Sequence, residues 1–268
     1  MQKDVHFYLT YALAMKVGVP AKDAEIIAWA DQYTDDLTVA DLHGIQTQSD
    51  IAGNWADRQV QFSVLVPFHF IPGSDEQHPW MTVRNSWRAR KLVAAYSNDL
   101  FRLGIALHGL QDTFSHETFS GWQEELNNCF QWYYVKSILP NVGHAEMRVV
   151  PDVVNYVWTD PRNGKKIDNK KRTMNAAKVT YDYLKKYFAP NSDPTLWQQL
   201  QKKLQPMFQL ESYDQRVTEI CKLSGNDQID FKKVNAQLEK KHKADFIQAA
   251  RNHLALTMEL FRDLPSVA

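Results

Sequence analysis

Two histidines and an aspartate recur at four-residue spacing in one segment, Leu107-His108-Gly109-Leu110-Gln111-Asp112-Thr113-Phe114-Ser115-His116-Glu117. An α-helix turns once per about 3.6 residues, so His108, Asp112 and His116 project from one helical face. The preceding segment, 87–107, has apolar residues at helical spacing and no proline, which favours a helix there. Imidazole nitrogens and carboxylate oxygens are ligands that suit zinc, iron or manganese. This stripe therefore predicts a metal site on a helix.

Each part of the pattern also has an interpretation without a metal. The two histidines of the stripe could simply hydrogen-bond to Asp112, because polar pairs four residues apart are common on helices. Asp31 and Asp35 also lie four residues apart, and their repulsion is relieved by a metal, by an arginine or by solvent. His69 stands between two phenylalanines, where it is either a core residue bonded to backbone or a ligand shielded from water.

Composition and charge exclude several classes of function. The 268 residues are 44% hydrophobic and 23% charged, which is typical of a globular chain with a large core. Lys+Arg and Asp+Glu number 31 each, so no bulk charge favours nucleic acid or an anionic membrane. We find neither a membrane span nor a signal peptide. We expect a cytoplasmic protein, or one exported after loss of a signal peptide; the sequence indicates no oligomeric state.

Helical periodicity covers most of the chain and predicts an all-α fold. The expected helices, bounded by glycine and proline, are 4–17, 21–37, 86–120, 122–139, 169–188, 195–205, 212–223, 231–238 and 244–264. Prolines make 61–73 an expected extended or loop segment. We expect one domain over residues 1–268, a multi-helix bundle with a metal site between its helices. The metal-site part would span 1–160, and a helical scaffold would span 165–268.

Seven of the nine histidines lie in the first 152 residues, five of them beside acids or in apolar segments. With the nearby aspartates, the candidate metal ligands are His6, Asp31, Asp35, His69, His108, Asp112, His116, His144 and Asp152. So many nitrogen and oxygen donors exceed what one tetrahedral ion takes and suit two or three ions. The sequence leaves open which of Asp31, Asp35 and Asp36 faces the site.

The order and context of these residues resemble the zinc-dependent phospholipase C and single-strand nuclease superfamily, an all-α fold with a trinuclear zinc site. The resemblance covers roughly residues 4–152. In the first half of this region it is carried by three segments, Lys3-Asp4-Val5-His6, Ala28-Trp29-Ala30-Asp31-Gln32-Tyr33 and Phe68-His69-Phe70-Ile71. In the family, the corresponding aspartate bridges metals and the corresponding histidines are ligands. His108 and Asp112 match the family's His-x-x-x-Asp pair, His116 stands for the next ligand, and His144 begins the last pair.

The chain also resembles a related bacterial family of unknown function. That family opens with Gln-x-Asp-x-His-Phe-Tyr-x-Thr-Tyr-Ala-Leu-Ala and has an Asp-Asp pair, here Asp35-Asp36, at the end of its second helix. The chain departs from the zinc enzymes at the terminus, where Met1 stands in place of a metal-binding tryptophan. His116 also follows Asp112 more closely than in the enzymes, and Arg148 stands where the last pair has an acid.

The resemblance implies a metal-dependent hydrolase of phosphoesters with two or three Zn²⁺ ions, or iron or manganese in their place. A metal-bound hydroxide would be the nucleophile, and Asp31 or Asp35 would orient it or accept its proton. The substrate would be a small phosphoester or a phospholipid-like molecule, flanked by aromatic residues such as Phe70 and Trp132. Two alternatives stay open: a non-catalytic metal-binding helical protein, and a di-iron or di-manganese bundle, although the Glu-x-x-His repeat of that class is absent.

Overall fold

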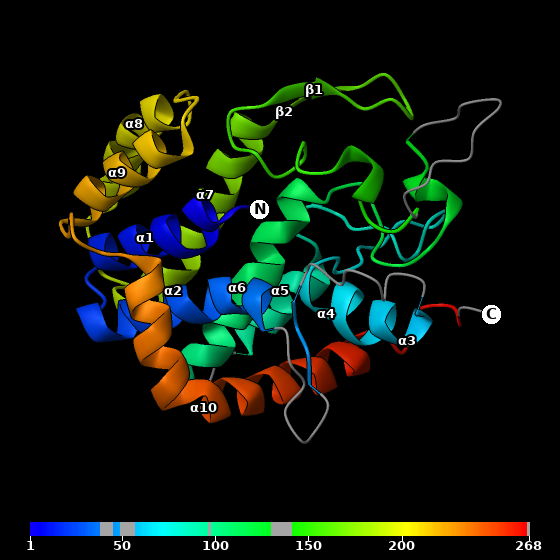
Figure 1. Ribbon diagram of the computed structural model, residues 1–268, viewed down its shortest axis with the longest axis horizontal. Coiled ribbons are helices and arrows are strands. Elements are labelled where there is room, and N and C mark those ends of the chain that lie inside the picture. The colour runs from blue at the N-terminus through cyan, green and yellow to red at the C-terminus, as the bar shows by residue number, and fades with distance from the viewer. Residues whose placement is uncertain (38–44, 49–56, 96–97, 130–140, 267–268) are drawn as a thin grey trace.

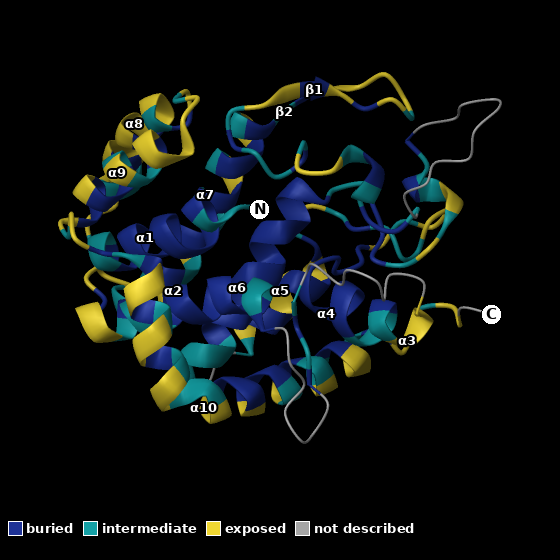
Figure 2. Cartoon of the chain, viewed as in Figure 1, coloured by how far each residue is buried: buried dark blue, intermediate teal, exposed yellow. Residues whose placement is uncertain are grey.

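Helix α6 (Leu100–Ser115) runs through the centre of the fold and carries most of the predicted stripe (Figure 1). Every residue of α6 from Leu103 to Ser115 is buried, as the dark colour of this helix shows in Figure 2. The computed structural model describes residues 1–37, 45–48, 57–95, 98–129 and 141–266. Within these ranges the elements are helices and one small two-stranded sheet, which confirms the predicted all-α fold.

Helix α6 is preceded by a separate helix, α5 (Trp87–Ala94), so the expected single helix over 86–120 is wrong. Asn98 adopts a left-handed φ of 61°, which a continuous helix does not allow. The side chain of Asp99 then accepts hydrogen bonds from the N–H groups of Phe101 and Arg102, at 3.0 and 3.1 Å. An aspartate in this position satisfies N–H groups that have no partner within the helix, and so starts a new helix.

The first residues form a π-helical segment, η1 (Asp4–Leu9), that continues into α1 (Thr10–Val17). Gly18 ends α1 with a φ of 94°, and α2 (Ala21–Asp36) starts directly after Pro20. These bounds confirm the helices predicted over 4–17 and 21–37. Helix α2 packs along α6, which brings the aspartates of α2 to the stripe of α6.

The close approach of α2 and α6 depends on Gly104. A Cβ atom at this position would lie 2.5 Å from the backbone oxygen of Ile27 and 2.6 Å from Cβ of Ala30. Helix propensity favours alanine over glycine by about 1 kcal/mol, but backbone atoms of α2 cannot move aside without shifting the whole helix. Packing against α2 therefore decides whether an alanine at position 104 stabilises or destabilises the protein.

We expect Gly104→Ala to lower the free energy of unfolding by about 1–3 kcal/mol, measured by urea denaturation. Gly109→Ala is the matched control on the same helix. Its Cβ would meet the flexible end of Ile71, at 2.6 Å, and the backbone oxygen of Phe68 only at 3.1 Å, so we expect a smaller loss. Equal losses for the two variants would contradict the assigned role of Gly104.

The segment expected to be extended, 61–73, is instead helical in its first half, so that prediction is wrong. After α3 (Arg58–Val60), the π-helical η2 (Gln61–Leu65) leads into α4 (Val66–Phe68). Pro67 stands near the C-terminal end of this continuous helical run, where it does not prevent the preceding turns from forming. The chain leaves the helical conformation at His69, which places this side chain at the helix end beside α6.

Beyond α6, the expected helix over 122–139 is not borne out where the structure describes it. Residues 130–140 lie outside the described ranges, and the described part contains only a 3₁₀ turn, η3 (Glu125–Asn127). The loop predicted over 141–152 includes a second 3₁₀ turn, η4 (Ala145–Met147). A hairpin that the periodicity did not reveal follows, with β1 (Val157–Thr159) antiparallel to β2 (Lys166–Asp168).

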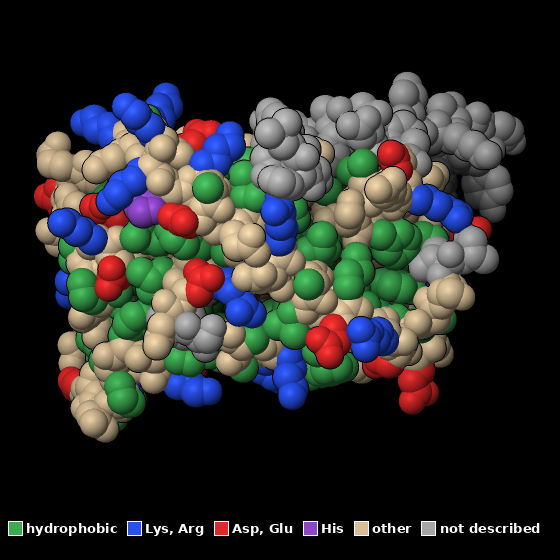
Figure 3. All heavy atoms as spheres, turned by 90° about the horizontal axis from the view of Figure 1, so that it is seen from below, with side chains coloured by type: hydrophobic (Ala, Val, Ile, Leu, Met, Phe, Trp, Pro, Cys, Tyr) green, Lys and Arg blue, Asp and Glu red, His purple; other side chains and the backbone are tan. Residues whose placement is uncertain are grey.

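The C-terminal half is helical, as expected. It comprises α7 (Asn169–Phe188), α8 (Leu196–Met207), α9 (Tyr213–Ser224) and α10 (Phe231–Leu260). The two helices predicted over 231–264 are one, because 239–243 contains neither glycine nor proline. On the face in Figure 3, acidic and basic side chains are interspersed among apolar ones, in keeping with the zero net charge. Among the described residues, no helix has the length and apolar character needed to cross a bilayer.

Helix α10 contacts the segments that carry the predicted ligands. Its Asn235 accepts a hydrogen bond of 2.8 Å from the indole N–H of Trp29 in α2. Its His253 donates through Nε2 to the carbonyl of Pro67, at 3.0 Å, next to the segment of His69. Burial lowers the pKa of His253 to about 4, so the ring is neutral near pH 7. The C-terminal half therefore fixes the place of two ligand-bearing segments.

Candidate metal centre

The structure brings all nine predicted ligands into one connected cluster. They come from five parts of the fold: η1, the last turns of α2, the end of α4, α6 with its last residue's neighbour His116, and the segment around η4. Their contacts form three groups, which we call the first, second and third groups. The first group is Asp35, His69, His108 and Asp112; the second is His116, His144 and Asp152; the third is His6 with Asp112 and the amine of Met1. The ninth residue, Asp31, also has ligand spacing to His6 and His108.

The first group has the spacing of ligands around one ion. Oδ2 of Asp112 lies 3.2 Å from Nδ1 of His69 and 3.2 Å from Nε2 of His108. Oδ1 of Asp35 lies 3.8 and 3.7 Å from the same two nitrogens. Donors at 2.0–2.2 Å from a tetrahedral ion are about 3.3–3.6 Å apart. The nitrogens of His69 and His108 lie 2.9 Å from each other, closer than this spacing. Asp35, His69 and His108 could therefore hold one ion after a small outward shift, with Asp112 beside them.

The second group lies next to the first, on the side of the loop after η3. Nε2 of His116 is 3.3 Å from Oδ1 of Asp152, and Nε2 of His144 is 3.4 Å from Oδ2. Phe70 stacks on His116, with ring centroids 4.3 Å apart, and shields it from water. His144 and Asp152 are partly exposed, at 15% and 17%. The second group is therefore more accessible than the histidines of the first.

The third group shares Asp112 with the first. Oδ1 of Asp112 lies 3.2 Å from Nε2 of His6, whereas its Oδ2 faces His69 and His108. The amine of Met1 donates to Oδ1 of Asp112, lies 3.3 Å from the hydroxyl of Ser115 and lies 3.5 Å from Asp152. The two oxygens of one carboxylate thus face two neighbouring groups.

The outer nitrogens of three histidines are bonded to backbone carbonyls. His69 donates through Nε2 to the carbonyl of Thr47 at 2.7 Å. His116 and His144 donate through Nδ1 to the carbonyls of His69 and Arg148, each at 2.8 Å. A carbonyl can only accept, so each outer nitrogen carries the hydrogen. In the neutral ring, the inner nitrogen then presents a lone pair to the cluster.

Asp31 acts in the same way for His6 and lies near His108, whose Nδ1 has no hydrogen-bond partner among the described residues. Its Oδ1 lies 2.9 Å from Nδ1 of His6 and 3.3 Å from Nδ1 of His108. Its Oδ2 accepts hydrogen bonds from Thr10 at 2.8 Å and from Gln111 at 3.0 Å. Asp31 therefore lies behind the two imidazoles, whereas Asp112 faces their inner nitrogens.

The inner nitrogens thus face carboxylate oxygens, and those of His69 and His108 also lie 2.9 Å from each other. Nε2 of His6, Nδ1 of His108 and Oδ1 of Asp152 are among the buried polar atoms that have no hydrogen-bond partner in the described part of the chain. An acceptor that faces another acceptor in a buried site is unfavourable unless a cation or an additional proton lies between them. The first and second groups therefore have the chemistry of a cation site, whereas in the third the Met1 amine already places a positive charge beside Asp112.

The electrostatics show the same demand for positive charge. Burial disfavours charge on Asp112, but His116, the Met1 amine and His108 outweigh it and hold the pKa of this carboxyl well below its usual range. Burial likewise opposes protonation of His108, yet Asp112 and Asp35 raise its pKa to about 10. Burial lowers the pKa of His69. Without an ion, the cluster therefore holds protons on some rings and not on others.

Two polar residues of the cluster were not predicted as part of it. Gln111 accepts from Nδ1 of His6 at 2.9 Å, and both Gln111 and Thr10 bond to Asp31. Their spacing carries a signal, because Thr10 follows His6 by four residues and so shares its helical face. Asp36, left open as a candidate, is instead bonded to Gln32 at 3.4 Å. Of the aromatic residues expected near a substrate, Trp132 lies outside the described residues.

Comparisons with known proteins give one match. No curated protein and no solved structure matches the chain. One family of unknown function, DUF6765, matches residues 1–261. This range includes every residue of the three groups and nearly all of the helical C-terminal half. The chain therefore belongs to DUF6765, a family of unknown function.

Proposed function

We propose that this protein is a metal-dependent hydrolase of phosphoesters, related in its chemistry to the zinc-dependent phospholipases C and single-strand nucleases. One observation carries the proposal. Five imidazoles have their outer nitrogens next to obligate acceptors, and their inner nitrogens converge on the carboxylates of Asp35, Asp112 and Asp152. This arrangement of neutral imidazole and carboxylate, oriented from behind by a carbonyl or a second carboxylate, is typical of zinc sites.

The three groups suit two or three ions. The first group offers four donors and would hold one ion tightly. The second group offers three donors and would leave a position for water or substrate, as catalytic zinc sites do. The third group would take an ion that shares Asp112 with the first only by displacing the proton of the Met1 amine. Iron and manganese accept the same donors, and zinc is the ion favoured by the tetrahedral spacing.

Bound divalent ions would acidify a coordinated water and neutralise the charge of the phosphoryl oxygens. The side chains determine where such a water could react. Asp35 is 17% exposed, as is Asp152, so the open side of the cluster lies near these two carboxylates. His108 and other cationic neighbours outweigh burial and lower the pKa of Asp35, which keeps it ionised. Asp35 is therefore placed to accept a proton, whereas Asp31 orients two ligands.

Asp31 and Asp35 should respond differently to removal of their charge. We expect Asp35→Asn to lower turnover of a phosphodiester by more than about 100-fold at every zinc concentration, because it removes a ligand and the proton acceptor. We expect Asp31→Asn to weaken zinc binding by about 10–100-fold, with turnover largely restored at high free zinc. The measurement is turnover of a chromogenic phosphodiester against buffered free zinc.

Asp36→Asn is the matched control, because this neighbouring side chain bonds to Gln32 and belongs to none of the three groups. We expect it to retain both zinc affinity and turnover. Full turnover by the Asp35→Asn protein, with an Asp31→Asn protein that no zinc concentration restores, would reverse the two assigned roles.

The proposed function is tested by elemental analysis, an optical spectrum and a turnover assay on the same preparation. An affinity tag belongs at the C-terminus, because the Met1 amine contacts Asp112. Zinc together with phosphodiester turnover would support the proposal. Colourless metal without turnover would favour a non-catalytic metal protein, and a coloured iron spectrum would favour an oxidative centre. A protein that takes up no metal would refute the proposal.

A further inference from the structure

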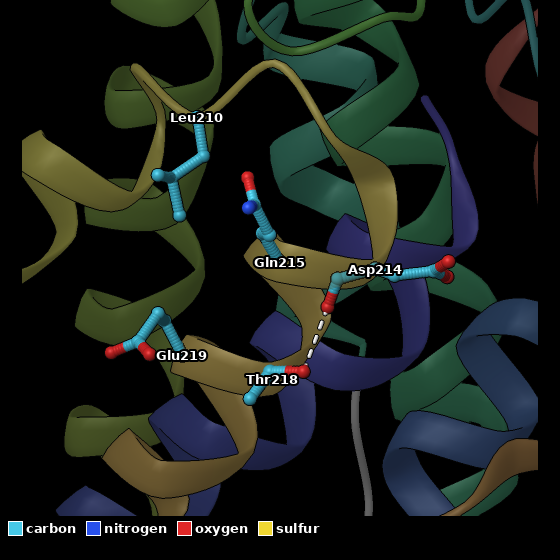
Figure 4. A pocket seen from close by; sticks show the side chains of 5 residues that line it. All are labelled: Leu210, Asp214, Gln215, Thr218 and Glu219. Atoms are coloured by element: carbon cyan, nitrogen blue, oxygen red, sulfur yellow. Dashed lines mark hydrogen bonds between the residues drawn. The ribbon is translucent and has the colours of Figure 1, made fainter.

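Arg216 is a buried cation that lies far from the predicted ligands in sequence. Its Nε donates to Oδ2 of Asp4 at 2.8 Å, and both side chains are almost fully buried. Its Nη1 donates to the carbonyl of Leu210 at 2.9 Å and lies 3.5 Å from Oδ1 of Asn155. The outer side of α9 forms the pocket in Figure 4, lined by neighbours of Arg216 such as Gln215. Arg216 itself is directed into the protein.

Both side-chain partners of Arg216 belong to segments of the metal centre. Asp4 stands two residues before His6 in η1. Asn155 stands three residues after Asp152. His6 belongs to the third group, and Asp152 lies 3.5 Å from the amine in that group. One guanidinium thus joins η1, which carries His6 of the third group, to the segment of Asp152, which lies beside that group.

We propose that Arg216 is a positioning residue of the metal centre. Through Asp4 it fixes η1, and with it His6, against the segment of Asp152, so that the C-terminal half governs cation binding at the third group. The inference rests on the proposed metal site. A buried ion pair contributes little stability in itself, but removal of one partner leaves the other charge buried without compensation. The ion pair therefore makes the position of η1 depend on α9.

The test compares zinc binding by wild-type protein, Arg216→Met and Arg216→Lys, measured by elemental analysis after dialysis against buffered free zinc. We expect Arg216→Met to bind its weakest zinc equivalent about 10–100-fold less tightly, with the remaining equivalents unchanged. Arg216→Lys keeps a charge beside Asp4 and should recover part of this affinity. If Arg216→Met does not fold, the double variant Asp4→Asn/Arg216→Met leaves no unpaired charge and is measured instead.

Arg88→Met is the matched control. Arg88 is equally buried and makes two 2.7 Å hydrogen bonds to Asp263, but it joins α5 to the residues after α10 rather than to η1. We expect it to lower stability and to leave zinc binding unchanged. Unaltered zinc binding by the Arg216 variants, or an equal loss in Arg88→Met, would overturn the positioning role. A wild-type protein without zinc would instead overturn the proposed function.

Discussion

Asp112→Ala is expected to remove the bound metal and to reduce phosphodiester turnover by more than about 100-fold. Loss of a residue that only orients a metal ligand already costs about 10–100-fold, and Asp112 touches the inner nitrogens directly. Its Oδ2 is 3.2 Å from both His69 and His108, and its Oδ1 is 3.2 Å from His6. Without this carboxylate, three imidazoles lose the anion that they share. The effect should therefore extend to the first and third groups together.

Metal content and turnover of the Asp112→Ala protein are measured on samples whose fold is checked by circular dichroism. Asp160→Ala is the control, because Asp160 is equally buried but is paired with Arg162 in the hairpin turn, at 2.7 Å. We expect this variant to lose stability and to keep its metal. Asp112→Asn preserves shape and should still lose metal, since an amide is a poorer ligand than a carboxylate. Wild-type turnover by either Asp112 variant would refute the hydrolase proposal.

The helices that could be predicted are those whose signal is local. Helix α7 has the predicted bounds, 169–188, because its apolar stripe and its ends are set by nearby residues. Two errors, over 61–73 and 86–120, arose at junctions. The prediction over 61–73 treats Pro67 as a helix breaker although it stands near the end of a helical run, and the interruption before α6 depends on the backbone of Asn98. Conformations of single residues are weakly encoded in periodicity.

The identity of the cluster could be predicted more fully than its arrangement. Residue type and order picked out nine side chains that do meet, although no spacing relates His6 to His108. The different positions of Asp31 and Asp35 relative to the imidazoles could not be predicted. Both residues lie on α2, and only the packing of α2 on α6 shows which carboxylate faces the inner nitrogens. Arg216 was missed because 212 residues separate it from Asp4. Contacts of this kind depend on the tertiary fold alone.

Removal of the metal should lower the thermal midpoint by roughly 8–16 °C. A ligand present at about 1,000 times its dissociation constant stabilises the native state by about 4 kcal/mol. One kcal/mol shifts the midpoint of a chain of this size by roughly 2–4 °C. The measurement compares unfolding in a chelator with unfolding in buffered free zinc. Identical midpoints would contradict the presence of a metal bound only by the folded protein.

The stabilisation of the fold by bound metal should also grow as pH rises. The direction of this pH dependence follows from the titration of His108. In the metal-free protein, Asp112 and Asp35 overcome burial and raise the pKa of His108 from 6.5 to about 10. The protonated ring therefore stabilises the metal-free fold fully below pH 6.5, and this contribution is lost as pH rises through about 10. Zinc requires the deprotonated ring, so at fixed free zinc it competes with a proton that becomes easier to displace over the same range.

The difference between the loaded and metal-free midpoints is therefore expected to widen from pH 6.5 towards pH 10. His108→Gln removes the titrating ring. It should abolish the part of the pH dependence of the metal-free midpoint that comes from His108. His242→Gln is the matched control, because His242 pairs with Asp245 in α10, outside the cluster, and should leave both midpoints unchanged. A difference that stays constant or narrows with rising pH would favour the alternative in which protonated histidines, and not a metal, neutralise the aspartates.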